Sequence, residues 1–299
     1  MYLEFFRLKK YPFQNTSDSA FFYEGNKQRE ALARLTYGIQ ESKGLMLITG
    51  KVGSGKTMLV RGFTSRLGPE WQVIEVNNPW LSAQELFRFL MLKLNIETDP
   101  HKAGDPPLDL LRKSLIDLEQ RGGRVLLIID EAQLFSHDAL EGVRLLYNLE
   151  TESHKLLPTL LVGQEELDAL LRTHPMRALH QRIRVSYVMD YLSTDATDAY
   201  IQHRLRMAGG DAYLFPSNCI TMIHGASRGC PRMVNNICDD TLLHAFGLRQ
   251  TRITQDIVEE VIASLKDDET DELGDEIDQP PAKPVDTSKN MSHASHDSI

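Results

Sequence analysis

The sequence predicts an α/β protein, in which a parallel sheet with helices on both faces is followed by a small all-helical domain and an acidic tail. Short apolar runs alternate with amphipathic helical patterns from residue 20 to about residue 188, which is typical of such a sheet. After Tyr191 only helical periodicity remains. Beyond residue 265 large apolar residues are almost absent, so too little surface can be buried to offset the ordering entropy and we expect disorder. The expected parts are residues 1–190, residues 191–265 and the tail at residues 266–299.

Five apolar runs have the length and composition of buried strands. They are Leu45–Thr49, Gln72–Val76, Val125–Ile129, Thr159–Val162 and Arg184–Tyr187. Capping signals mark several helix starts: Ser82 with Glu85 three residues on forms a capping box, and Ser136 and Ser193 stand at further N-cap positions. The helices expected in the second domain are Thr194–Met207, Ser217–Ser227, Pro231–Phe246 and Thr254–Leu265.

Composition and charge limit the classes to which the protein can belong. The chain has 299 residues, of which 41% are hydrophobic, enough for a sizeable core. Ten acidic residues and two lysines after Lys266 carry −8 of the formal charge of −9, so the rest of the chain, at −1, does not have a uniformly basic surface. The three cysteines lack metal or disulfide spacing. No apolar run approaches the length of a membrane span and the start lacks a signal-peptide core, so we expect a cytoplasmic protein without an integral membrane segment.

The segment Gly50–Thr57 matches the phosphate-binding pattern GxxxxGK(S/T), directly after an apolar strand and before the helical run Met58–Leu67. Glycines let backbone N–H groups curl around phosphates at a helix N-terminus, Lys56 reaches the β and γ oxygens, and the Thr57 hydroxyl is a ligand for Mg²⁺. The residues expected to bind a nucleotide here are Gly50, Val52, Gly53, Ser54, Gly55, Lys56, Thr57 and Met58.

A buried strand that ends in Asp130-Glu131 provides the second half of such a site. Asp130 would hold the magnesium ion with its water shell, and Glu131 would orient or deprotonate the attacking water. The alternative is an acid pair at a helix N-terminus. The sole Asn-Lys pair, Asn26-Lys27, precedes the phosphate-binding loop and lacks the Asp of the guanine-reading N-K-x-D pattern, so ATP is favoured over GTP.

Further polar and basic residues are candidates for contacts with the γ-phosphate. Gln164 follows the fourth strand, at the end where ligands bind in open α/β sheets, and it contacts either the γ-phosphate or the water, or else it caps the helix after it. Arg177, Arg182 and Arg184 lie just before and inside the last strand. Any of them is either an ordinary surface arginine or one that stabilises phosphoryl transfer in a neighbouring subunit.

One arginine of the helical domain stands at an unusual position. Arg232 follows Gly229-Cys230-Pro231, a helix stop and a new helix start. An arginine is unfavourable at the positive end of a helix dipole unless it faces an anion. We therefore expect Arg232 to point at the nucleotide, and we assign no role to Asn235 and Asn236 one turn later.

Several motifs outside the phosphate-binding loop agree in order and spacing with one family. They include Phe13, Thr16-Ser17-Asp18, Phe21-Phe22-Tyr23, Asp130-Glu131-Ala132-Gln133, Asn148-Leu149-Glu150-Thr151, Leu161–Leu167, Gln181-Arg182-Ile183 and His203-Arg204-Leu205. Through them residues 1–265 resemble the AAA+ ATPases, and more narrowly the ExeA/GspA-type ATPases of secretion and pilus assembly. Longer members continue into a transmembrane helix and a peptidoglycan-binding domain. This sequence contains neither, so we expect it to be most similar to the short members associated with mannose-sensitive haemagglutinin (MSHA) pili, a type IV pilus.

The resemblance implies roles for individual residues. Lys56 and Thr57 correspond to Walker A, Asp130 and Glu131 to Walker B, Gln164 to sensor 1 and Arg232 to sensor 2, with Thr57 and Asp130 as the metal ligands. Gln164 departs from the Asn or Thr commonest at sensor 1. Arg182, with Arg177 second, corresponds to an arginine finger that acts across a subunit interface, which implies a homo-oligomer. The adenine would lie between the two domains, near Tyr11-Pro12-Phe13.

Two functions of different classes follow from these expectations. The first is an Mg²⁺-dependent ATPase that couples hydrolysis to assembly of a type IV (MSHA-like) pilus or a type II secretion machine, with inner-membrane assembly proteins as partners. The second is a nucleic-acid-handling ATPase, like transposition regulators and clamp loaders. Its DNA contacts would come from arginines of the helical domain, namely Arg204, Arg206, Arg228, Arg249 and Arg252. A third possibility is a switch that binds ATP but scarcely hydrolyses it.

Overall fold

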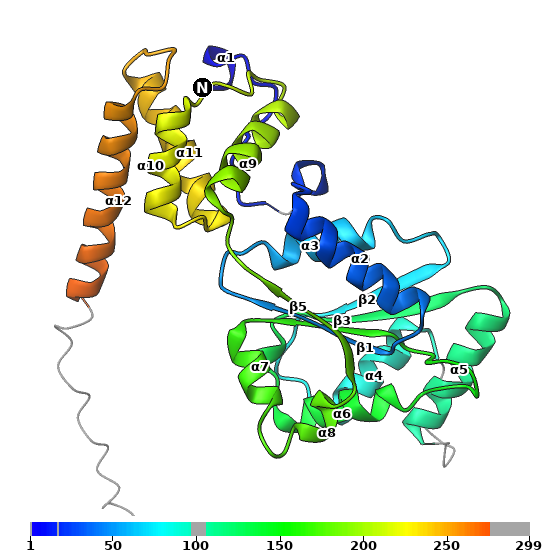
Figure 1. The fold of residues 1–299 in the computed structure, drawn as a ribbon. Helices are drawn as coiled ribbons and strands as arrows, with labels where there is room; N and C mark the ends of the chain where they lie inside the picture. The colour runs from blue at the N-terminus through cyan, green and yellow to red at the C-terminus, as the bar shows by residue number, and fades with distance from the viewer. Residues whose placement is uncertain (1, 17, 97–105, 276–299) are drawn as a thin grey trace, which may run out of the picture.

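The computed structural model describes residues 2–16, 18–96 and 106–275, and it has an α/β part and a helical part (Figure 1). The sheet has the strand order β2-β3-β4-β1-β5, and every pairing is parallel. The strands are β1 Leu45–Gly50, β2 Trp71–Val76, β3 Arg124–Ile129, β4 Thr159–Gly163 and β5 Ile183–Met189. All five predicted strands are confirmed, and so is the predicted fold class.

Helices cover both faces of the sheet, which is why its central strands are continuous apolar runs. Strand β1 sends Met46 and Ile48 into one hydrophobic cluster and Leu45 and Leu47 into the other. On one face lie α2 (Asn26–Gln40) and α3 (Lys56–Thr64) (Figure 1). The helices on the opposite face are α4 (Ala83–Lys93), α5 (Pro107–Gln120), α6 (His137–Tyr147), α7 (Glu165–Leu171) and α8 (Arg177–His180).

The predicted helix caps are confirmed. Ser82 accepts a hydrogen bond from the Glu85 N–H, and the Glu85 carboxylate accepts one from the Ser82 N–H, which completes the capping box at the start of α4. Ser136 and Ser193 cap α6 and α9 in the same way, through the N–H groups of the third residue of each helix. These local bonds fix where the chain turns from loop to helix.

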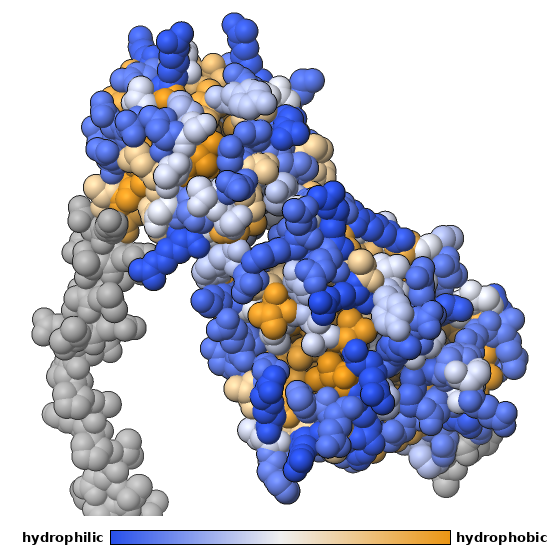
Figure 2. All heavy atoms as spheres, viewed as in Figure 1, coloured by the Kyte–Doolittle hydropathy of each residue, from blue (hydrophilic) through white to orange (hydrophobic). Residues whose placement is uncertain are grey.

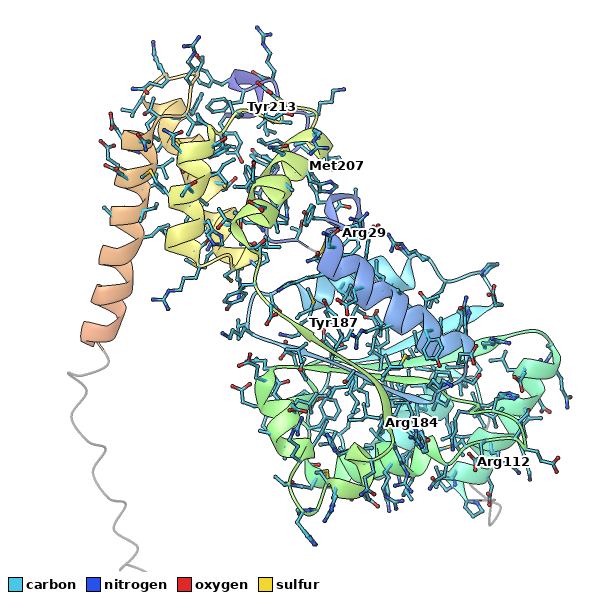
Figure 3. The ribbon with its side chains drawn as sticks, viewed as in Figure 1. Arg29, Arg112, Arg184, Tyr187, Met207 and Tyr213 are labelled. Atoms are coloured by element: carbon cyan, nitrogen blue, oxygen red, sulfur yellow. The ribbon has the colours of Figure 1, made fainter. Side chains whose placement is uncertain are left out.

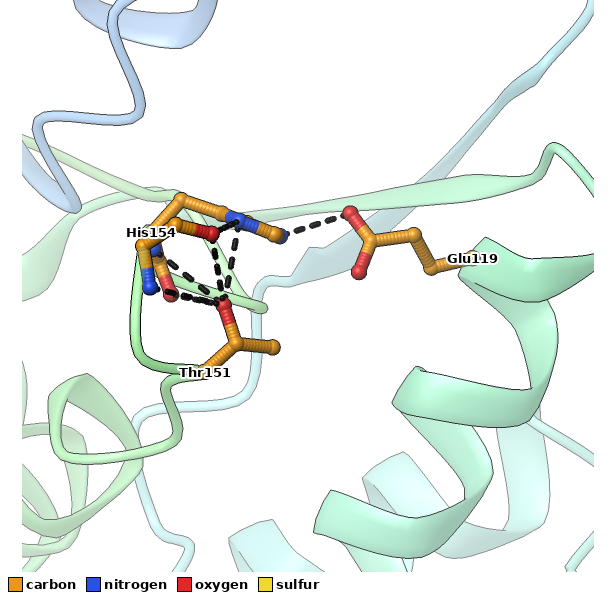
Figure 4. A network of polar contacts seen from close by, with 4 residues as sticks. Glu119, Thr151 and His154 are labelled. Atoms are coloured by element: carbon orange, nitrogen blue, oxygen red, sulfur yellow. Dashed lines mark hydrogen bonds and ion pairs between the residues drawn. The ribbon is translucent and has the colours of Figure 1, made fainter.

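Strand β5 lies at one edge of the sheet, and a polar network lies near the amino ends of the strands. Apolar side chains show on the surface in the region of this edge strand (Figure 2). Its residue Val188 is 56% exposed. Near the amino ends of the strands a polar network joins α5 to the loop before β4 (Figure 4). There His154 Nε2 lies 2.7 Å from Glu119 Oε1 and His154 Nδ1 lies 3.1 Å from Thr151 Oγ1. This network holds the loop to the helix, far from the carboxyl ends of the strands.

The helical part begins directly after β5. Its helices are α9 (Thr194–Met207), α10 (Ser217–Ser227), α11 (Pro231–Gly247) and α12 (Gln255–Asp275). The predicted helices match these to within one residue, except at the end of α12. The disordered tail was expected to begin at residue 266, and α12 extends the assigned helix to Asp275. Residues 276–299 of the expected tail lie outside the described residues.

The N-terminal segment packs on the helical part. It contains α1 (Tyr2–Phe5) and the 3-10 turn η1 (Ser19–Phe21). Phe13, only 1% exposed, meets the ring of Phe215 edge-on at 5.9 Å and belongs to the hydrophobic cluster of α9–α12. The expected α/β domain, residues 1–190, included this segment. Its packing favours assignment to the helical part, and we propose a domain division with residues 2–21 placed there.

Among the helices in residues 2–16, 18–96 and 106–275, none is both long and apolar enough to cross a bilayer.

Candidate functional site

A cavity at the carboxyl ends of the strands is lined by the phosphate-binding loop on one side and by the helical part on the other. Five of the residues with predicted roles meet there from separate elements of the chain. They are Lys56 and Thr57 of α3, Glu131 after β3, Gln164 after β4 and Arg232 of α11. Val52, Gly53, Gly55 and Met58 complete the wall on the side of the loop.

Lys56 is the first residue of α3, and its side chain is buried against the phosphate-binding loop. Its side chain is 7% exposed, and Nζ donates hydrogen bonds to the carbonyl oxygens of Gly50 at 2.8 Å and Lys51 at 3.1 Å. Burial lowers the pKa of Lys56, while the carboxylates of Glu131 and Asp130 act in the opposite direction. An ammonium group has three donors, so one N–H remains for an anion in the cavity.

The helical part packs directly against the loop. Gly53 has φ +74°, and a Cβ atom there would lie 2.8 Å from Cys230 Sγ and 3.0 Å from the Arg232 Cβ. A side chain at this position would therefore both strain the backbone and push α11 away. Tyr191, between β5 and α9, donates from its hydroxyl to the Val52 carbonyl at 2.9 Å. A shift of the phosphate-binding loop would therefore displace the start of α11 through these contacts.

Two glutamine side chains hold Glu131. Gln133 Nε2 donates to Glu131 Oε2 at 2.6 Å, and Gln164 Nε2 donates to the same oxygen at 3.3 Å. The Gln164 N–H in turn donates to Gln133 Oε1 at 3.1 Å. Gln164 stands at the N-cap position of α7, as the alternative role expected, but its side chain makes no capping hydrogen bond to that helix. No role was predicted for Gln133 from the sequence. Its position two residues after Glu131 was the signal that could have identified it.

Asp130 and Thr57 present the oxygen donors that Mg²⁺ prefers. Asp130 directly follows β3, and its carboxylate accepts a hydrogen bond from the Glu131 N–H at 2.9 Å. Burial raises the pKa of Asp130, and the nearby Lys56 acts against this. Within the described residues no cluster of three His, Cys, Asp or Glu side chains forms a metal cage. One carboxylate, one hydroxyl and the phosphates of a substrate are the donor set with which Mg²⁺ commonly binds, so these residues fit the ion.

The candidate finger arginines lie outside the cavity of their own chain. Arg182 directly precedes β5, whose first residue pairs with Leu45 at the start of β1. Arg182 therefore lies at the amino ends of the strands, whereas the phosphate-binding loop lies at their carboxyl ends. The Arg182 Nη1 donates to the Ala178 carbonyl at 2.6 Å. Arg184 lies near the start of β5 and is exposed (Figure 3). Neither these arginines nor Arg177 belongs to the described cavity wall.

An apolar cavity adjoins the first one. It is lined by Phe21-Phe22-Tyr23 of the N-terminal segment, by Met189 and Leu192, and by Ser54, whose buried hydroxyl has no hydrogen-bond partner among the described residues. A flat aromatic base fits such a lining. The expected segment around Phe13 does not reach it, because the Phe13 side chain is buried among the helices of the helical part.

Arg204 was named among possible DNA contacts, and the structure contradicts this. The side chain is 4% exposed, lines both cavities, and donates to the carbonyl oxygens of Pro12 and Gln14 and to the Tyr200 hydroxyl. A buried guanidinium cannot reach a nucleic acid backbone. Asn15, Thr16, Tyr200 and Asn235, which also line the first cavity, were likewise missed.

Comparisons with known proteins agree with this geometry. Residues 39–171 match the family model described as an AAA domain. The chain is 37% identical over 246 residues to general secretion pathway protein A of Aeromonas hydrophila, which covers 82% of this chain and 45% of that protein. The chain therefore spans less than half the length of that relative.

Solved structures share the fold. The ORC2 protein of Aeropyrum pernix in its ADPNP and ADP complexes has a TM-score of 0.61 at 17% identity, over 85% of this chain and 71% of that chain. CDC6P of Pyrobaculum aerophilum has a TM-score of 0.59 at 17% identity, over 82% and 70% of the two chains. A RuvB mutant of Thermotoga maritima has a TM-score of 0.57 at 18% identity, over 82% and 71%.

Proposed function

Since the chain carries an AAA domain and resembles general secretion pathway protein A, we propose that it is an Mg²⁺-dependent ATPase of a secretion or pilus assembly machine. The observation that carries the proposal is the single cavity lined by Lys56, Thr57, Glu131, Gln164 and Arg232. These residues combine a phosphate cradle, a metal ligand, a carboxylate and an amide beside the same space.

Binding would begin at the phosphate-binding loop. Backbone N–H groups of the loop and the third N–H of Lys56 take the phosphates, and Ser54 offers an unpartnered hydroxyl nearby. Mg²⁺, when bound by Thr57 and Asp130, neutralises charge on the β and γ phosphates. The apolar wall of Phe21-Phe22-Tyr23 receives the base.

Hydrolysis would use Glu131 to orient the attacking water and accept its proton. Gln133 and Gln164 both donate to Oε2 of this carboxylate, which leaves Oε1 to accept a hydrogen bond from the water. Gln164, one strand further along, is close enough to Glu131 to report the loss of the γ-phosphate. Arg232 faces the cavity from the positive end of α11, where an anion offsets its charge.

The work that hydrolysis performs is proposed from similarity. Resemblance to a protein named for the general secretion pathway supports a role in a type II secretion machine. We propose the related type IV pilus machine of the MSHA kind, represented by MshM, on the motifs shared with that group. The protein would then act in the cytoplasm, held at the inner membrane by its partners, as an oligomer in which Arg182 of one subunit completes the site of the next.

Steady-state ATP turnover, measured against the concentration of the 299-residue protein, tests this function. We expect turnover per subunit to rise with protein concentration, because the site is completed by assembly, and to be the same with and without double- or single-stranded DNA. Strong stimulation by DNA would contradict the assembly function and favour the nucleic-acid-handling class. No turnover despite tight ATP binding at every concentration would instead favour an ATP-binding switch.

Arg182→Ala should lower turnover by at least about 100-fold, given the size of arginine-finger effects in other nucleotide hydrolases. Mixing this variant with Lys56→Ala protein should restore activity, because intact sites of the first variant would receive Arg182 from the second. Arg184→Ala is the matched control, since it removes an exposed arginine from the same edge of the sheet. If mixing rescues neither the Arg182 variant nor the corresponding Arg177 variant, the shared site is rejected.

A further inference from the structure

We propose that a groove between α11 and α12 binds a basic amphipathic helix of a partner protein. The two helices lie next to each other in the helical part (Figure 1). The proposal goes beyond the ATPase function, because the groove belongs to the helical part alone and none of its wall residues lines the nucleotide cavity.

The groove is an open hollow of about 810 Å³, larger than the nucleotide cavity of about 300 Å³. On one side its wall includes Leu243 and Gly247 of α11, and on the other Val261 and Leu265 of α12. Residues four apart lie on the same face of a helix. The groove is therefore bounded by one face of each helix and runs along both.

Apolar side chains line the groove and remain partly in contact with solvent. Leu243 is 47% exposed and Leu248, just after α11, is 50% exposed. Gly247 leaves the wall open between them, because a Cβ atom there would meet no other atom within 4 Å. Exposed apolar residues gathered in one concave place are typical of interaction surfaces.

The shape of the groove suits a helix. A helix that lies in a groove between two others inserts a stripe of apolar side chains at intervals of three and four residues. Along α11 the wall extends from Asp240 to Leu248, a length of about 12 Å at the rise of an α-helix. About two turns of a partner helix would therefore contact it.

The wall of the groove is acidic. It contains the carboxylates of Asp240 and Glu260 and, among the described residues, no lysine or arginine. Glu260 Oε2 lies 2.8 Å from His244 Nε2, whereas Asp240 has no ion-pair partner within the described part of the chain. Burial and the charge of Asp239 raise the pKa of Asp240. A cation brought into the groove would offset this uncompensated charge.

Charge also selects among the possible occupants. The last ten residues of α12, KDDETDELGD, have one lysine and six acidic residues, so the following part of the chain is repelled from an acidic groove. Two copies joined groove to groove would place Asp240 and Glu260 near their own counterparts, which is unfavourable. A basic partner is attracted instead. Because Arg249 follows Leu248 at one end of the groove, the partner's positive charges would face the Asp240 end.

Fluorescence anisotropy with a labelled peptide of about three Leu/Lys heptads, added to the 299-residue protein, tests the groove. The leucines of this probe form one stripe of a helix and the lysines occupy the other positions. A second peptide has glutamate in place of lysine, and a third has the Leu/Lys composition in scrambled order. We expect the first to bind at least about tenfold more tightly than either of the others, because both the stripe and the charge are required.

Gly247→Arg should lower affinity for the Leu/Lys probe by at least about tenfold, because its side chain would occupy the groove and repel lysines. Gly247 does not have a positive φ and has open space at its Cβ position, so the fold can accept the change. Asp240→Asn should weaken binding by about threefold, the size of a partly exposed charge pair.

Gly225→Arg is the matched control. Gly225 is an exposed glycine of α10, outside the groove, where a Cβ atom would also meet no atom within 4 Å. The variant adds the same charge to the helical part, and we expect wild-type affinity for the Leu/Lys probe. A loss in both variants would show only that added charge repels the probe, and would overturn the groove.

Equal affinity for the three peptides, or wild-type affinity in Gly247→Arg, would likewise overturn the proposal. Binding of a labelled peptide of residues 276–299 to the wild type and not to Gly247→Arg would assign the groove to the chain's own C-terminal residues, and so reject an external partner. Sedimentation velocity without peptide addresses the remaining occupant. Loss of self-association in Gly247→Arg, with self-association kept in Gly225→Arg, would assign the groove to a second copy and reject the proposal as well.

Discussion

Replacing Lys56 by alanine should weaken ATP binding by at least about 100-fold, because charge-assisted hydrogen bonds to phosphate are lost at the centre of the loop. The ammonium group is buried with carbonyl oxygens as its hydrogen-bond acceptors, and burial lowers its pKa. Without a nucleotide this charge is poorly compensated, so the variant should be at least as stable as the wild type. Titration calorimetry with ATP, together with thermal denaturation of the free protein, measures both effects.

Lys51→Ala provides the control for this experiment. Lys51 belongs to the same loop, but its side chain is exposed and its Nζ lies 5.6 Å from the ring centre of Tyr191. Its backbone carbonyl, which accepts a hydrogen bond from Lys56, is kept in the variant. We expect ATP affinity close to that of the wild type. Undiminished ATP binding by Lys56→Ala would refute the assignment of the phosphate-binding loop.

Glu131→Gln should bind ATP normally and lower kcat by about 10²–10⁴-fold, the usual contribution of a positioned general base. Glutamine keeps the shape of the side chain, and its amide oxygen can still accept the hydrogen bonds that Gln133 and Gln164 donate to Oε2. The amide nitrogen then takes the place of the carboxylate oxygen that would receive the proton. The variant therefore removes the base and retains the geometry around it.

Glu166→Gln is the matched control for the loss of charge. Glu166 is an exposed carboxylate of α7 whose charge also acts on Lys56, and its replacement should change kcat by less than about twofold, as expected for a solvent-screened charge. Single-turnover hydrolysis and ATP titration separate the chemical step from binding. A near-normal single-turnover rate in Glu131→Gln would eliminate Glu131 as the group that activates water.

The arrangement of the sheet followed largely from local patterns. Strands such as Leu45–Gly50 are buried on both faces, so they appear in the sequence as unbroken apolar runs. The capping box at Ser82 and Glu85 uses groups three residues apart, so it is visible without tertiary information. The assigned end of α12, at Asp275, lies beyond the predicted end at Leu265.

The surroundings of a buried side chain were harder to predict than its burial. The aromatic residues at the start of the chain indicate that this segment packs on something, but its partners are α9–α12, almost 200 residues away. The adenine was expected near Tyr11-Pro12-Phe13, but the apolar cavity is lined by Phe21-Phe22-Tyr23, because the Phe13 side chain packs against Phe215. Hydrophobicity favours burial without selecting a partner.

By itself the sequence determined the fold class, the strands, most helix ends and the nucleotide motifs, because each depends on residues that are neighbours along the chain or repeat with the period of a helix or strand. Only the tertiary structure decided how Gln133 reaches Glu131 and Gln164, and how Arg204 and Asn235 hold the N-terminal segment. The contacts of these two residues with the N-terminal segment join residues about 190 to 220 positions apart. Their geometry arises when the helical part packs on the phosphate-binding loop, and no local propensity contains it.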